Sequence, residues 1–217
     1  MNTLMDPVKQ INEALGRKIC DALLANGYKV AEYAHDVSGA VEIAAGMIPD
    51  GASVGIPGTV TVRQTGLIER LEGKGCLIFH HWDPDLTGDA RSDRLAEENA
   101  ADWFVTSSNA ITYDGKIVNI DGTGNRIAGM AWGRNSILYI IGINKAARDV
   151  ESAIQRCRDT AAVPNNARIG IAPPCVKVGR CVDCGVPERS CRAVLILERA
   201  PFGRDARVII VGQALGY

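Results

Sequence analysis

The sequence predicts an α/β fold in which helices flank a mostly parallel sheet. Short apolar segments alternate along the chain with segments of helical periodicity. Several of the apolar segments, such as "CLIFH" and "SILYIIGI", are continuously apolar, which is typical of strands buried on both faces. The 217 residues, 47% of them apolar, are enough to form one substantial core. We expect one domain over residues 1–217, with an irregular cysteine-rich segment at 164–192.

The first half of the chain begins with an amphipathic helix. Apolar residues recur at helical spacing from Asp6 to Asn26, where Pro7 suits the first turn and Gly27 suits the C-terminal stop. Strands and helices then alternate. We expect strands at 28–34, 52–56 and 76–80, and helices at 36–48, 61–72 and 84–101, the helix at 61–72 beginning with a capping box of Thr61 and Gln64.

A further strand at 102–108 begins the second half. The segments "NAITY" and "KIVNI" are rich in β-formers and are joined by Asp114-Gly115, which predicts a hairpin. A glycine-rich loop with a short helix, "DGTGNRIAGMAWG", precedes a strand at 136–143 and a helix at 148–161. The strands "AVLILE" and "RVIIVG" follow the cysteine-rich segment. Because no repeat or long linker interrupts this series, one domain is expected.

The charge of the chain is nearly balanced but unevenly distributed. A formal charge of -1 gives no general attraction to nucleic acid or to anionic membranes. Residues 168–217 contain eight Lys/Arg against four Asp/Glu, so an anionic ligand or partner is expected near this end. The N-terminal segment has no signal-peptide pattern, and no apolar segment is long enough to span a membrane. We therefore expect a cytoplasmic protein.

Two glycine-rich turns form the predicted ligand site. In "SVGIPGTVTVRQTG" a strand ends and a helix begins, and its amides, with the hydroxyls of Thr59 and Thr61, suit an oxyanion. The turn matches neither a Walker A loop nor a dinucleotide fingerprint. Its alternative interpretation is a tight turn in which glycine serves only the backbone geometry.

The second turn lies in "SSNAITYDGKIVNIDGTGNRIAGM". In open α/β sheets ligands bind outside the carboxyl ends of the strands, so both turns are expected to face one crevice. Arg126 either binds a carboxylate or phosphate through two parallel hydrogen bonds or only pairs with Asp121. His80 and His81 are adjacent on an extended segment and point opposite ways, which disfavours a shared metal. A single His of this pair, or Asp83 or Asp85, is left to reach the crevice.

Four cysteines, Cys175, Cys181, Cys184 and Cys191, lie close together in the cysteine-rich segment. Four thiolates satisfy a tetrahedral zinc ion and equally an iron-sulfur cluster. A reactive dithiol and a disulfide between the two cysteines of Cys-Val-Asp-Cys are the alternatives. The other three cysteines are expected to be small core residues.

Several of these segments in combination resemble the LUD-domain family, named for lactate utilisation. They are "GIPGTVTVRQTGLIERL", "SSNAITYDGKIVNIDGTGNRIAGMAWG", "IGINKAARDVESAIQRCR" and "CVDCGVPERSC", the last of which is similar to a subgroup with a C-terminal four-cysteine motif. The resemblance implies a NagB/RpiA/CoA-transferase-like fold and a role in oxidising lactate or related organic acids beside iron-sulfur partner proteins. Carried over to this chain, the crevice would consist of Gly55, Gly58, Thr59, Thr61, Asn109, Asp121, Gly124, Asn125 and Arg126.

Three functions follow as hypotheses, because a fold of this kind hosts many activities. The first is a LUD-type protein that binds a small anionic ligand and carries an iron-sulfur or zinc site at the four cysteines. The second is an isomerase or transferase acting on a phosphosugar or a CoA ester. The third is a non-catalytic subunit that docks on an iron-sulfur oxidoreductase through the cysteine-rich segment. A homo-oligomer is compatible with each, and no acid or base is assigned.

Overall fold

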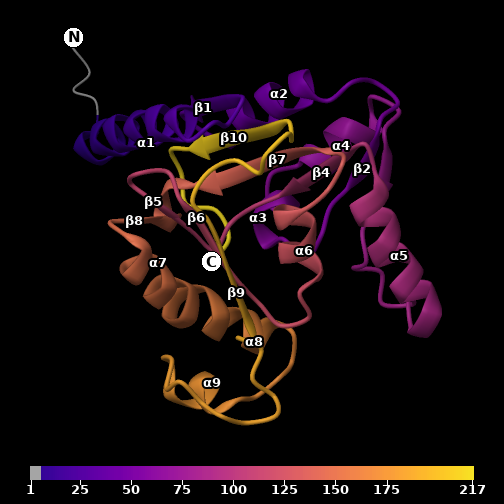
Figure 1. Cartoon of the computed structure of the whole chain (residues 1–217), viewed down its shortest axis with the longest axis vertical. Coiled ribbons are helices and arrows are strands. Elements are labelled where there is room, and N and C mark those ends of the chain that lie inside the picture. The colour runs from indigo at the N-terminus through magenta and orange to yellow at the C-terminus, as the bar shows by residue number, and fades with distance from the viewer. Residues whose placement is uncertain (1–5) are drawn as a thin grey trace.

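The computed structural model describes residues 6–217 and contains a large and a small sheet (Figure 1). The large sheet is entirely parallel, with the strand order β1-β10-β7-β4-β2-β3. Its strands are β1 (Val30–Ala34), β10 (Ala206–Val211), β7 (Ser136–Gly142), β4 (Trp103–Thr106), β2 (Ser53–Gly55) and β3 (Leu77–Phe79). The predicted α/β class with a mostly parallel sheet is confirmed.

The small sheet is mixed and has the order β8-β5-β6-β9. Its strands are β8 (Ala146–Ala147), β5 (Ala110–Thr112), β6 (Ile117–Asp121) and β9 (Ala193–Leu197). The predicted hairpin is confirmed, because β5 and β6 pair antiparallel across a turn in which Gly115 has a φ of 83°. The two strands that follow the cysteine-rich segment separate, since β9 joins β6 while β10 enters the centre of the large sheet.

Helices cover both faces of the large sheet, as predicted. One apolar cluster joins α2 (Val37–Met47) and α4 (Leu67–Glu72) to one face; another joins α1 (Pro7–Ala25) and the small sheet to the opposite face. Along β7 the side chains alternate between the two clusters, with Leu138 in the first and Tyr139 in the second. Within residues 6–217, no helix is long and apolar enough to cross a membrane.

The helix expected at 61–72 is in fact two helices, α3 (Val60–Arg63) and α4. Thr59 is the N-cap of α3, its Oγ1 accepting the Val62 amide at 3.4 Å, so the expected capping box at Thr61 is wrong. The break lies at Thr65 and Gly66, where the Thr65 hydroxyl donates to the Val62 carbonyl and Gly66 has a φ of 77°. This break turns the chain away from the carboxyl end of β2.

The remaining helices also differ in extent from the prediction. The helix expected at 84–101 begins later, as α5 (Gly88–Ala100). The helix expected at 148–161 starts as α7 (Val150–Arg156) and continues through a π-helix at Cys157–Ala162 into α8 (Val163–Arg168). The segment 164–192 is therefore not wholly irregular, since it also contains α9 (Pro174–Val178). Figure 1 shows α8 and α9 at one end of the molecule, beyond α7.

Candidate functional site

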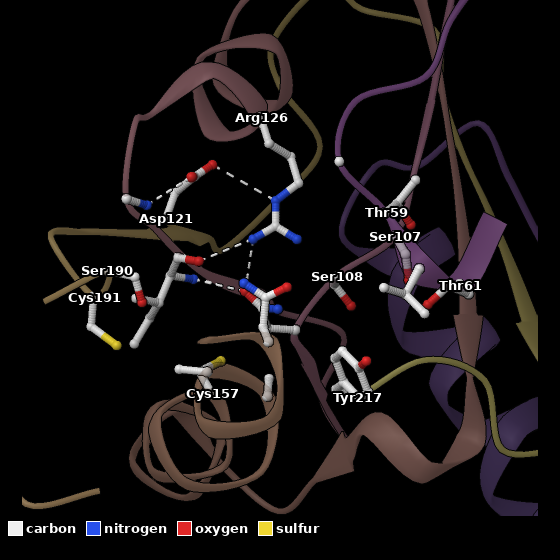
Figure 2. A pocket seen from close by; sticks show the side chains of 18 of the residues that line it. Thr59, Thr61, Ser107, Ser108, Asp121, Arg126, Cys157, Ser190, Cys191 and Tyr217 are labelled. Atoms are coloured by element: carbon white, nitrogen blue, oxygen red, sulfur yellow. Dashed lines mark hydrogen bonds and ion pairs between the residues drawn. The ribbon is translucent and has the colours of Figure 1, made fainter. Parts of the chain in front are cut away.

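A cavity of about 180 Å³ lies at the carboxyl ends of the parallel strands. Its lining residues follow β2, β3, β4, β7 and β10, which places five strand ends at one opening. Its far wall comes from β6, α6 (Asn125–Ala131) and the π-helix. In Figure 2, Thr59, Thr61 and Ser107 lie on one side, with Asp121, Ser190 and Cys191 on the other. The strand-end crevice expected from the chain order is thus present.

Seven of the nine predicted crevice residues line this cavity. They are Gly58, Thr59, Thr61, Asn109, Asp121, Asn125 and Arg126. Gly55 and Gly124 do not line it. Each is instead at a position where the backbone requires glycine. A Cβ on Gly55 would lie 1.8 Å from the carbonyl oxygen of Glu98, so α5 can approach β2 only where the strand carries glycine. Gly124 precedes α6 with a φ of 90°, which favours glycine.

Arg126 points into the cavity from the first turn of α6 (Figure 2). Its Nη2 donates to Asn109 Oδ1 and to the Ile120 carbonyl, both at 3.0 Å. Its Nε lies 3.7 Å from the Asp121 carboxylate. That carboxylate also accepts the amides of Gly122 and Ile127, so Asp121 helps to begin α6 as well as pairing with Arg126. Burial lowers the pKa of Arg126 from its usual value.

Lys145 is the main lining residue that the sequence analysis did not identify. Its side chain is 3% exposed, and its Nζ donates to Thr61 Oγ1 at 2.6 Å, Ser107 Oγ at 3.0 Å and the Ser108 carbonyl at 3.0 Å. Burial, together with the positive charges of Arg156 and Arg126, holds the pKa of Lys145 well below its usual value. The available signal was its position directly after the apolar strand at 136–143.

The cavity combines excess positive charge with an unpaired hydroxyl. Arg126, Lys145 and the exposed Arg168 line it, and Asp121 carries the single side-chain carboxylate among the lining residues. Ser108 Oγ is buried and has no hydrogen-bond partner within the described residues 6–217. Buried polar atoms normally have a partner, so this hydroxyl is free to donate to a ligand of the cavity.

The four cysteines of the cysteine-rich segment line a second, smaller cavity together. Ala162, Ser190 and Cys191 line both cavities, so the two share a wall. In the described part of the chain, no three His, Cys, Asp or Glu side chains are already arranged to hold one metal ion. Cys20, Cys76 and Cys157 are buried, as expected for core residues, and burial raises the pKa of Cys157 to about 12.

Fold and site together define a class: an α/β protein with a basic cavity at the carboxyl ends of a parallel sheet. The family model of the LUD domain matches residues 17–211. The chain belongs to the LUD-domain family.

A crystal structure of a DUF162 family protein from Deinococcus radiodurans is similar in fold, with 15% sequence identity and a TM-score of 0.50. The alignment covers 92% of this chain and 98% of that chain. At this identity the similarity concerns the fold alone. No curated protein sequence matches this chain.

Proposed function

We propose that this LUD-domain protein binds a small organic anion in the strand-end cavity and acts in the use of lactate or a related organic acid. The observation that carries this proposal is that Lys145 is buried and Arg126 largely buried beside the Ser108 hydroxyl, which has no partner among residues 6–217. Burying positive charge is unfavourable unless opposite charge accompanies it, and Asp121 alone does not balance the lining cations. A bound anion supplies the missing charge.

The size and polarity of the cavity favour a small carboxylate. A volume of about 180 Å³ is below the ~300–1,000 Å³ of pockets for drug-sized ligands. Arg126 uses Nη2 for Asn109 and Ile120, which leaves Nη1 for a ligand. Because Nε faces Asp121, Nη1 alone can donate a charge-assisted hydrogen bond to a carboxylate oxygen, and the two parallel hydrogen bonds expected from the sequence are not available.

Isothermal titration with L-lactate, pyruvate and inorganic phosphate tests the proposal. At least one carboxylate should bind to the unmodified protein, and Arg126→Gln should weaken that binding about 10- to 100-fold, the usual worth of a charge-assisted hydrogen bond. Arg70→Gln is the matched control, because Arg70 pairs with Glu42 on the surface. Binding that is absent for every anion, or that is equal in both variants, would remove the assignment.

We further propose that the four cysteines hold one metal ion. The chain turns between Cys181 and Cys184 at Asp183, whose φ of 45° is in the left-handed region. The Asp183 amide donates to Cys181 Sγ at 3.4 Å, a contact that stabilises a thiolate. Arg189 donates to the carbonyls of Cys184 and Cys191, at 2.7 and 2.9 Å, and thereby holds these two residues near each other.

Charge and space in the second cavity favour zinc over a cluster. Four thiolates around Zn²⁺ leave two negative charges, and the guanidinium groups of Arg158 and Arg189 lie nearby to offset them. The free space is about 10 Å³, room for a single ion but not for a multi-atom cluster. The thiols must still close around either group, because no three ligands among residues 6–217 are already arranged for one ion. Bound zinc would fix the rest of this segment to α9, which carries Cys175, and its role would be structural.

Metal and acid-labile sulfide analysis of protein purified without oxygen and without added zinc tests this second proposal. About one zinc ion per chain is expected, lost in Cys184→Ser and retained in Cys76→Ser, since Cys76 is buried outside the segment. Iron with sulfide would instead assign a cluster and an electron-transfer role beside an iron-sulfur partner. A metal-free protein would contradict the proposal.

A further inference from the structure

A buried histidine and glutamate form a close pair at the edge of the strand-end cavity. His81 follows β3, and its Nδ1 lies 2.7 Å from Oε1 of Glu98 on α5. The side chain of His81 is 12% exposed and that of Glu98 is 0% exposed. His81 lines the cavity, so one face of the pair is buried while the other is open to a ligand.

The position of this pair is fixed by α5. Arg91 donates to the His81 carbonyl at 3.0 Å, and Arg94 donates to the His80 carbonyl at 3.2 Å. The backbone of Glu98 packs directly on Gly55, so the helix cannot move away from β2 without opening that contact. The helix therefore holds both the backbone and the ring of His81.

The burial of the Glu98 carboxylate costs folding free energy that a purely structural role does not explain. Its second oxygen, Oε2, has no hydrogen-bond partner among residues 6–217. A fully buried carboxylate with one unpaired oxygen lowers stability, because desolvation is not fully compensated. A buried carboxylate that contacts a histidine lining a cavity is a candidate for a functional role.

The free nitrogen of the His81 ring faces the cavity across Gly58. A methyl group added at Gly58 would lie 3.6 Å from Nε2, so the absence of a side chain there leaves Nε2 accessible. A carboxylate can only accept a hydrogen bond, so Glu98 places the ring hydrogen on Nδ1. Nε2 then carries the lone pair and is the basic atom of the ring.

We propose that His81, positioned by Glu98, is a general base that removes a proton from the carbon next to the carbonyl of a small 2-oxo acid. This inference rests on the proposed function, because Arg126 binds the carboxylate of the same ligand. Lys145 and the Ser108 hydroxyl supply the positive charge and the donor that a developing oxyanion needs. A base, a carboxylate site and an oxyanion site in one cavity define this reaction class.

The proposed step is balanced without an oxidant. The C–H bond breaks and its proton moves to His81 Nε2, while its electron pair forms the carbon–carbon double bond of an enolate. The carbonyl π pair moves to oxygen, where Lys145 stabilises the charge. The imidazolium then returns a proton to the carbon, or a deuteron after exchange with solvent, and the starting acid is restored.

Proton NMR of pyruvate and 2-oxobutyrate in deuterium oxide tests the proposal. The protein should accelerate loss of the hydrogens next to the carbonyl over a buffer blank. His81→Gln should slow this exchange about 100-fold or more, the usual contribution of a general base. His35→Gln is the matched control, because His35 lies 3.7 Å from Glu13 in an exposed pair of the same kind. An unchanged rate in His81→Gln would overturn the proposal.

Two further variants test the access to His81 Nε2 and the role of Glu98 while the protein stays folded. Gly58→Ala adds a methyl at ordinary contact distance from Nε2 and should suppress exchange without unfolding the protein. Glu98→Gln keeps an oxygen that can accept the Nδ1 hydrogen but removes the negative charge, so it should slow exchange, and nitrogen-15 chemical shifts report the tautomer of His81 directly. A His81 ring that carries its hydrogen on Nε2 in the unmodified protein would contradict the role of Glu98.

The outcomes of this experiment and of the anion titration are separable. If pyruvate binds and Arg126→Gln weakens the binding, but no exchange is catalysed, the proposed function stands and the His81 proposal fails. If neither acid exchanges and no anion binds, both fail. Exchange that is lost in His81→Gln and retained in His35→Gln supports both.

Discussion

At the scale of single residues, the proposed anion site depends on the placement of Lys145. An ammonium group buried among hydroxyls and a carbonyl satisfies its hydrogen bonds but not its charge. Arg156, which donates to the carbonyls of Asn109 and Asn144, adds to the positive potential at Lys145. The burial of Lys145 and the nearby positive charges disfavour its ammonium form. A ligand carboxylate would stabilise the ammonium form and raise the pKa of Lys145.

When an anion binds in alkaline buffer, Lys145 is therefore expected to take up a proton from solvent. The free protein holds the pKa of Lys145 well below its usual value, and a nearby anion favours the protonated form. Calorimetric titration with pyruvate in two buffers of different ionisation enthalpy measures the uptake. Lys145→Met should abolish it and weaken binding about tenfold or more, whereas Lys18→Met, an exposed site on α1, should change neither. Binding with no proton uptake across the alkaline range would contradict this account of Lys145.

Single residues also show where sequence reasoning stops. Arg126 was predicted because it follows a glycine-rich turn, a local pattern. Glu98 was not, because it lies on a helix with many charged residues and looks the same in sequence as its exposed neighbour Glu97. Its burial depends on the approach of α5 to Gly55, a contact between segments far apart in the chain. No local pattern encodes such a contact.

At the scale of elements, the break between α3 and α4 shapes the wall of the cavity. Thr61 lies in the short helix α3 and accepts a hydrogen bond from Lys145, while Gln64 at its C-cap accepts the amide of Gly216 near the end of the chain. A continuous helix through Gly66 would carry the chain past this position. The left-handed conformation of Gly66 is therefore needed for the geometry of the site.

Gly66→Ala is expected to destabilise the protein by about 1–2 kcal/mol, the usual penalty of the left-handed conformation for residues with a side chain. Added atoms would meet nothing within 4 Å, so strain alone acts. Gly46→Ala is the matched control, since it lies within α2 with equally open surroundings and should stabilise by about 0.5–1 kcal/mol. Urea denaturation measures both changes. A stabilising effect of Gly66→Ala would show that the break is not conformationally fixed.

The order and type of the elements were largely predictable, whereas their ends were not. The hairpin at Asp114-Gly115 and the first helix follow from local turn and capping chemistry. The π-helix at Cys157–Ala162 was not predicted, because its sequence continues the helical pattern of α7. Cys157 and Ala161 of this π-helix line the cavity. The packing of this segment against the cavity, and not its local sequence, accounts for the departure from regular helix geometry.

At the scale of the whole molecule, the fold places the cavity between its two sheets. The large sheet supplies the ends of five strands, and the small sheet, with α6 and the π-helix, supplies the opposite wall. The parallel order predicts that strand ends meet at one edge, so the position of the cavity followed from the sequence. The wall shared with the four-cysteine cavity did not, because the cysteine-rich segment carries no signal for where it docks.

A crystal structure of the protein with pyruvate bound is the most direct test of the anion site. We expect the carboxylate of pyruvate to lie within hydrogen-bond distance of Arg126. The keto oxygen of pyruvate should lie near Lys145 and Ser108. The same crystals of Arg126→Gln should lack the ligand. Pyruvate bound away from the strand-end cavity, or bound equally in the variant, would contradict the assignment of this cavity as the anion site.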